Sequence, residues 1–191
     1  MGLSFWRGKF TKTSGKVVLD RGSKTGGSIE IQIDAATVDF GHQKMNEKAR
    51  GDEMFNVAKF PTITYKSNAL KFDGDKLVGV EGEMTMLGVT KPMPLTVTHF
   101  KCVIHPMLKR EVCGADAHGR FDRSDYGMNI GLPRFSPEVK LAIQVEESVK
   151  AYSKHTQLRS LVVYGGVGLG KTHLIQAIGN LSKTGFPNTR V

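Results

Sequence analysis

Apolar and polar residues alternate along most of the first three quarters of the chain, as they do in β-strands that bury one face. The clearest runs are residues 28–34, 62–66, 77–86 and 139–146. In the third run we expect one face to carry Val78, Val80, Met84 and Met86; in the fourth it carries Val139, Leu141, Ile143 and Val145. The pattern predicts a domain built almost entirely from half-buried strands.

Turn-forming residues separate these runs at positions 21–23, 73–75, 88–92 and 132–133. Residues 42–50 are polar and free of β-branched side chains, and they predict one short helix across one end of the sheet. Evenly spaced strands with one apolar face favour an antiparallel barrel or sandwich. A barrel of about eight strands has an interior that side chains fill or that holds one small ligand.

The pattern changes after Glu147. Residues 148–160 are polar and basic, which predicts a linker. Residues 161–164 form a continuous apolar run, typical of a buried parallel strand, and a glycine-rich segment follows at 165–172. Residues 173–181 then predict a helix, and residues 189–191 the start of another strand. We therefore divide the chain into an all-β domain (1–147), a linker (148–160) and a truncated α/β fragment of strand, phosphate loop and helix (161–191).

Charge supports the same division. The chain has 191 residues and a net charge of +9, yet all 18 acidic residues lie before residue 148. A basic balance is compatible with an anionic partner such as nucleic acid. We interpret the acid-free tail instead as a segment of different origin, and we expect no nucleic-acid binding.

Catalytic and metal-binding patterns are missing from the sequence. The histidines of the β-rich part are scattered, with no two at metal-ligand spacing, and no serine or cysteine sits in a nucleophile motif. The sequence therefore predicts a binding protein and not an enzyme. No apolar window has the length of a membrane-spanning helix, and the first residues lack the pattern of a signal peptide.

The two cysteines, Cys102 and Cys113, flank a predicted hairpin turn at residues 105–108. This turn places them opposite each other, where a disulfide is sterically plausible. We expect a disulfide in an oxidising compartment and two reduced, half-buried thiols in a cytosol.

Four blocks, in order, carry a resemblance to the YceI family of lipocalin-like, polyisoprenoid-binding proteins. They are residues 55–67 (FNVAKFPTITYKS), 82–92 (GEMTMLGVTKP), 123–128 (RSDYGM) and 138–146. The resemblance covers about residues 2–147. It implies an eight-stranded antiparallel barrel whose apolar cavity holds a long isoprenoid or another amphiphilic lipid. The candidate cavity-lining residues are Ile31, Ile33, Phe55, Ile63, Tyr65, Val80, Met84, Met86 and Ile143; each could equally be ordinary core.

The chain departs from that family pattern in three ways. Relatives usually have a strand before the residues that match Gly2, so we expect a truncated first strand and an open sheet edge that allows a homodimer. Relatives are usually exported, which suggests the periplasm, whereas the sequence as written suggests the cytoplasm. Lys48 stands where relatives often have a histidine.

The glycine-rich segment fits the phosphate-loop pattern GxxxxGK[ST]. Residues 164–174 and 177–180 resemble the ATPase domain of DnaA, the bacterial replication initiator. The resemblance implies ATP and Mg²⁺ as possible ligands, bound by Gly165, Gly166, Gly168, Gly170, Lys171 and Thr172. No acidic residue follows Glu147 to complete a hydrolytic site, so we expect little or no hydrolysis. Three hypotheses remain: a lipid-binding module, an ATP-binding protein, and a chimera whose tail has no role.

Overall fold

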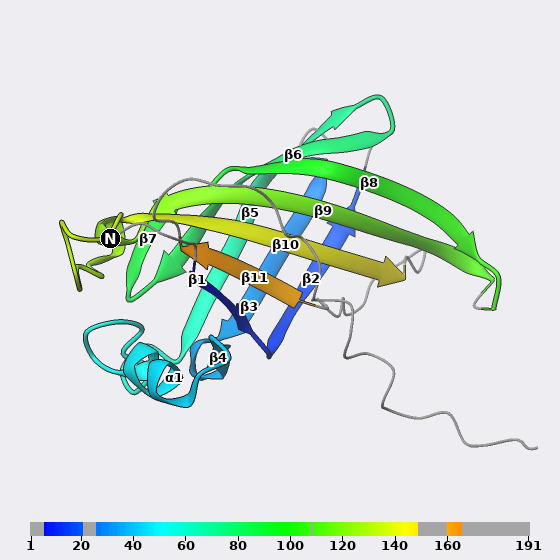
Figure 1. Cartoon of the computed structure of the whole chain (residues 1–191). Coiled ribbons are helices and arrows are strands. Elements are labelled where there is room, and N and C mark those ends of the chain that lie inside the picture. Colours follow the sequence, from blue (N-terminus) through cyan, green and yellow to red (C-terminus); the bar gives the residue numbers. More distant parts are fainter. Residues whose placement is uncertain (1–5, 21–25, 108, 149–159, 166–191) are drawn as a thin grey trace, which may run out of the picture.

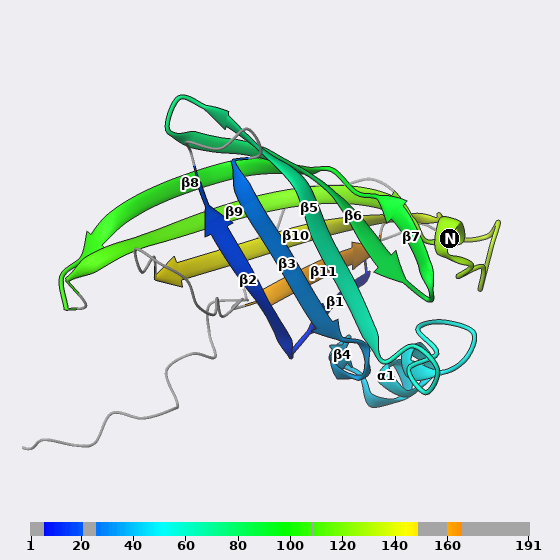
Figure 2. The same cartoon turned by 180° about the vertical axis from the view of Figure 1, so that it is seen from behind.

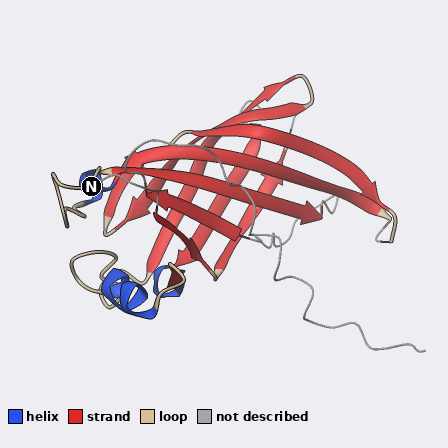
Figure 3. Ribbon diagram, in the orientation of Figure 1, coloured by secondary structure: helices blue, strands red, loops and turns tan. Residues whose placement is uncertain are grey.

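The computed structural model describes residues 6–20, 26–107, 109–148 and 160–165. In this part the protein is a strongly curled antiparallel sheet with one α-helix, which confirms the predicted fold class (Figure 1, Figure 3). The strands are β1 (Trp6–Phe10), β2 (Thr13–Leu19), β3 (Gly27–Asp34), β4 (Val38–Asp39), β5 (Thr62–Asp73), β6 (Lys76–Met86), β7 (Val89–Pro92), β8 (Leu95–His105), β9 (Arg110–Asp122), β10 (Glu138–Ser148) and β11 (Ser160–Gly165). The helices are α1 (Gln43–Arg50) and two 3₁₀ turns, η1 (Ala35–Thr37) and η2 (Arg123–Tyr126).

The strands follow the order β2-β3-β5-β6-β8-β9-β10-β11-β1-β4, and β7 pairs with β6 outside this path. The sheet curls back on itself because β1 continues into β2 through Thr11 and Lys12. That bend is held by a hydrogen bond from the Thr11 amide to the Thr37 carbonyl (3.2 Å) and one from the Asp34 amide to the Lys12 carbonyl (3.1 Å). The two halves of the sheet therefore face each other, as the opposite views show (Figure 1, Figure 2).

The strand at residues 160–165 differs from the prediction. We expected a parallel strand of a separate α/β fragment, but β11 lies antiparallel between β10 and β1, with Val162 opposite both Ala142 and Lys9. A continuous apolar run is compatible with either direction, so periodicity could not decide between them. The described sheet does have an open edge, but it lies at β2, the first strand in the pairing order; β1 pairs with β11 on one side and with β4 on the other.

The predicted inward position of Val78 on β6 is wrong, because the strand contains a β-bulge. We expected Val78 on the inner face with Val80, but Val78 is 41% exposed, whereas Leu77 and Val80 are buried. The register shifts here: Phe72 pairs with Leu77 and Lys71 with Gly79, which leaves Val78 as an extra residue. An inserted residue reverses the alternation, so Leu77 takes the inward position that strict alternation assigned to Val78.

The predicted helix is confirmed as α1, at one end of the sheet (Figure 1). Two of its side chains attach it to the strands. Asn46 accepts a hydrogen bond from the Phe40 amide (2.7 Å) and donates one to the Asp39 carboxylate (2.9 Å). Arg50 donates to the Ala36 carbonyl (2.7 Å). The helix thereby covers the end of the core nearest β4.

Tyr65 on β5 and Gly82 on β6 are in close contact, and both are buried. The Tyr65 hydroxyl donates a hydrogen bond to the Met93 carbonyl (3.1 Å), and burial raises the pKa of this hydroxyl still further above neutral pH. This ring leaves no room beside it. A Cβ atom on Gly82 would lie 2.4 Å from the Tyr65 hydroxyl oxygen and 2.6 Å from the Lys66 carbonyl oxygen.

We therefore expect Gly82→Ala to destabilise the protein by about 1–3 kcal/mol, because the added methyl group overpacks a filled site. The measurement is urea unfolding followed by intrinsic fluorescence. Gly79→Ala is the matched control on the same strand, since the atom nearest to its added Cβ, the Leu95 carbonyl oxygen, would be an ordinary 3.5 Å away. Equal unfolding free energies for the two variants would contradict the packing argument.

Candidate functional site

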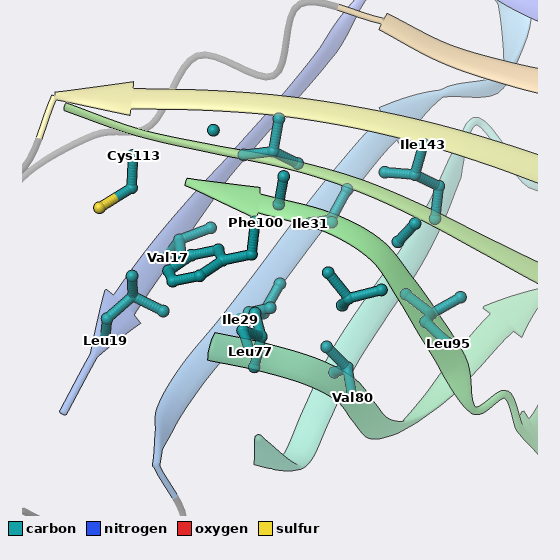
Figure 4. Close-up of a pocket in the computed structure, with 15 residues that line it drawn as sticks. Val17, Leu19, Ile29, Ile31, Leu77, Val80, Leu95, Phe100, Cys113 and Ile143 are labelled. Carbon is teal, nitrogen blue, oxygen red and sulfur yellow. The ribbon is translucent and has the colours of Figure 1, made fainter. Parts of the chain in front are cut away.

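An apolar cavity of about 60 Å³ lies between the two facing halves of the sheet. Figure 4 shows side chains from β2, β3 and β6 pointing toward those from β8, β9 and β10. The lining residues are Val17, Leu19, Ile29, Ile31, Leu77, Val80, Leu95, Val97, Phe100, Cys113, Gly114, Ala115, Ala117, Ile143 and Val145. None of these carries a charge, hydroxyl, amide or imidazole group, so the wall offers a ligand hydrophobic contact and shape.

Small residues on β9 make the space. Successive inward positions of this strand are Cys113, Ala115, Ala117 and Gly119, whereas the neighbouring strand β10 presents Val145 and Ile143 opposite the two alanines. Because Ala115 and Ala117 line the cavity, larger side chains at these two positions would extend into it. The sheet can therefore curl tightly and still leave a cavity.

The cavity lies beside the least paired edges of the sheet. Among the described strands, β2 ends the strand order and pairs with β3 alone, and β10 pairs with β11 as far as Gln144. Leu19 on β2 and Val145 on β10 therefore line the cavity from strands that each have an edge without a partner in the described part of the sheet. An opening here requires less hydrogen-bond rupture than one between fully paired strands.

The structure brings three of the nine predicted lining residues to the cavity: Ile31, Val80 and Ile143. It places the other six, Ile33, Phe55, Ile63, Tyr65, Met84 and Met86, in the packed core or against it. Phe55, for example, contacts the ring of Phe10 edge-on with centroids 5.4 Å apart. Alternation identifies the inward face of a strand, but it does not say how far along the strand the packing ends.

Sequence reasoning missed most of the cavity wall, including Val17, Ile29 and Phe100. One signal was present. The segment CGADA at residues 113–117 combines strand alternation with unusually small inward residues, which marks a strand that fills little volume.

The two cysteines stand opposite each other across β8 and β9, as predicted, and form a disulfide with an S–S distance of 2.03 Å. Their sulfur atoms and a Glu111 carboxylate oxygen lie within 4.8 Å of one another, the one such grouping among the described residues. Both sulfurs are committed to the disulfide, so neither is a thiolate ligand in this state.

Of the predicted nucleotide-binding residues, only Gly165 lies within the described part of the chain. It is the last residue of β11, opposite Trp6 and Val139. Gly166, Gly168, Gly170, Lys171 and Thr172 lie outside the described residues, as do the predicted helix and final strand. Among the described helices, none has the length and apolar character needed to cross a membrane.

Comparison with known proteins extends these observations. The family model of the YceI-like domain matches residues 1–147, and the model of the bacterial DnaA ATPase domain matches residues 135–191. Proteins named YceI from Salmonella arizonae and Salmonella enteritidis are each 31% identical to this chain over 146 residues, which is 76% of this chain and 75% of each relative.

Solved structures show the same fold. The YceI protein of Campylobacter jejuni has a TM-score of 0.66 at 23% identity, over 78% of this chain and 88% of its own. BcnA of Burkholderia cenocepacia has a TM-score of 0.56 at 23% identity, over 81% of this chain and 86% of its own. The family model spans most of the chain and the Salmonella relatives exceed 30% identity, so this chain belongs to the YceI-like family.

Proposed function

We propose that this protein binds an isoprenoid or another amphiphilic lipid, without catalysis, and holds the apolar tail between the two halves of its sheet. The observation that supports this most directly is the cavity itself, whose wall is apolar throughout. Transfer of a hydrocarbon chain from water to such a wall supplies about 0.8 kcal/mol per methylene, which is roughly a four-fold gain in affinity. The resemblance to polyisoprenoid-binding proteins favours the same class of ligand.

A long chain needs more space than about 60 Å³. Sites for drug-sized ligands commonly measure about 300–1,000 Å³. We therefore propose that the ligand separates the sheet halves on entry, and that β2, which among the described strands pairs with β3 alone, is the strand that moves.

We expect the purified protein to retain a long-chain lipid, released by extraction into organic solvent and identified by mass spectrometry. Addition of a long-chain isoprenol should raise the melting temperature, because a ligand that binds only the folded state stabilises it by mass action. A clean extract together with an unchanged melting curve would argue against lipid binding.

A substitution that fills the cavity tests whether the lipid tail binds there. Ala115→Leu adds three carbon atoms to the inner face of β9, at a residue that lines the cavity. We expect this variant to remain folded and to lose retained lipid, because its own side chain occupies the space of the tail. Extraction and melting curves, as above, provide the measurement.

Ala142→Leu is the matched control. Ala142 lies on the neighbouring strand, but it stands opposite His118 and between the inward residues Leu141 and Ile143, so it faces the other side of the sheet. This variant should retain lipid as the wild type does. Equal retention by both variants would place the ligand elsewhere.

ATP binding is a second candidate, favoured by the phosphate-loop motif and by the match to the DnaA ATPase domain. We propose weak binding with little or no hydrolysis, because no acidic residue follows Glu147. Calorimetric titration with ATP and Mg²⁺ should show binding that Lys171→Ala abolishes. No heat from the wild type, or equal affinity in the variant, would remove this candidate.

A further inference from the structure

The β8–β9 hairpin extends past the neighbouring strands at the end of the sheet nearest the cavity (Figure 1, Figure 2). Its tip exposes large apolar side chains. Val103 is 47% exposed, Ile104 68% and Met107 79%. These are three of the five exposed large hydrophobic residues in the described part of the chain; the others, Val78 and Phe135, lie on other elements.

Alternation shows that this segment has left the core. Val103 and Ile104 are successive strand residues whose side chains point to opposite faces. In a barrel wall one of them would be buried, yet both are exposed. The tip therefore presents apolar surface on both faces, with no layer of the described structure covering either.

Basic residues accompany the apolar ones. Lys101 is exposed on β8 and Lys109 is exposed in the turn before β9, and residues 99–111 contain three basic residues and one acidic residue. Lys109 adopts a positive φ of 51° at the turn, and the disulfide between Cys102 and Cys113 joins the strands just before the tip. The exposed apolar side chains therefore lie on a hairpin tip that a disulfide crosslinks and that also carries exposed lysines.

We propose that this tip docks on an anionic lipid bilayer, with Ile104 and Met107 entering the acyl region and Lys101 and Lys109 meeting the headgroups. Apolar residues that enter a membrane beside basic residues that contact anionic lipid are the two components of interfacial binding. The inference rests on the proposed function for its purpose, since the strands of the tip also line the cavity through Phe100 and Cys113. Docking would place the cavity beside the source of its ligand.

The test is sedimentation of the full chain with vesicles. We expect co-sedimentation with phosphatidylcholine vesicles that contain phosphatidylglycerol, less with phosphatidylcholine alone, and a decrease as salt is raised. Burial of one large apolar side chain contributes roughly a factor of ten or more to partitioning. The double variant Ile104→Gln/Met107→Gln should therefore bind the anionic vesicles at least about ten-fold more weakly.

Two controls separate the contributions. Val78→Gln alters an exposed valine near the β5–β6 turn and should sediment as the wild type does. Lys101→Gln/Lys109→Gln should lose the preference for anionic vesicles while it keeps the weaker binding to neutral ones. All variants replace exposed side chains, and circular dichroism melting curves are the check that each variant is folded.

Three results would overturn the docking proposal: no co-sedimentation of the wild type, unchanged binding by the Ile104/Met107 variant, or a wild-type dimer that this variant converts to monomer. The last would assign the tip to contact between two copies. Retained lipid is measured on the same samples. Loss of vesicle binding with lipid retained supports docking as a separate step, whereas vesicle binding by a wild type that never retains lipid would leave docking standing and refute the proposed function.

Discussion

One sheet must cover its own apolar face. The described part of the chain offers a single short helix, and that helix covers only one end. No other element of the described residues covers the inward side chains of the long strands, and they are buried because the sheet curls until its halves meet. The bend at Thr11 and Lys12 follows from that requirement, and so does the pairing of the strands in one continuous sheet.

Curling brings large residues into contact where they face large residues and leaves space where one strand is lined with small ones. At the α1 end, Tyr65, Met84 and Met86 fill the interior. Toward the β8–β9 hairpin, the alanines of β9 fail to reach the opposite wall, and the cavity results. A filled core and a binding site are therefore two outcomes of the same alternating pattern.

Features set by local sequence could be predicted, whereas features set by the pairing and packing of distant strands could not. Strands, helix and hairpin were predictable because alternation, a polar segment and turn residues are local signals. The position of Val78 was not, because a bulge depends on how two strands pair. The cavity was only partly predictable: Ile31 and Ile33 have the same pattern, but only Ile31 lines it. Strand β11 was assigned the wrong direction because its partners are distant in the chain.

The pairing of β1 with β11 has a consequence for how the chain folds. It joins Trp6 to Gly165, residues from opposite ends of the described chain. Contacts between residues so far apart in sequence form late, since the intervening loop must close first at an entropic cost. During synthesis, β1 leaves the ribosome long before β11 exists. The pairing of β1 with β11 therefore stays incomplete during synthesis, and these hydrogen bonds form after β11 has left the ribosome.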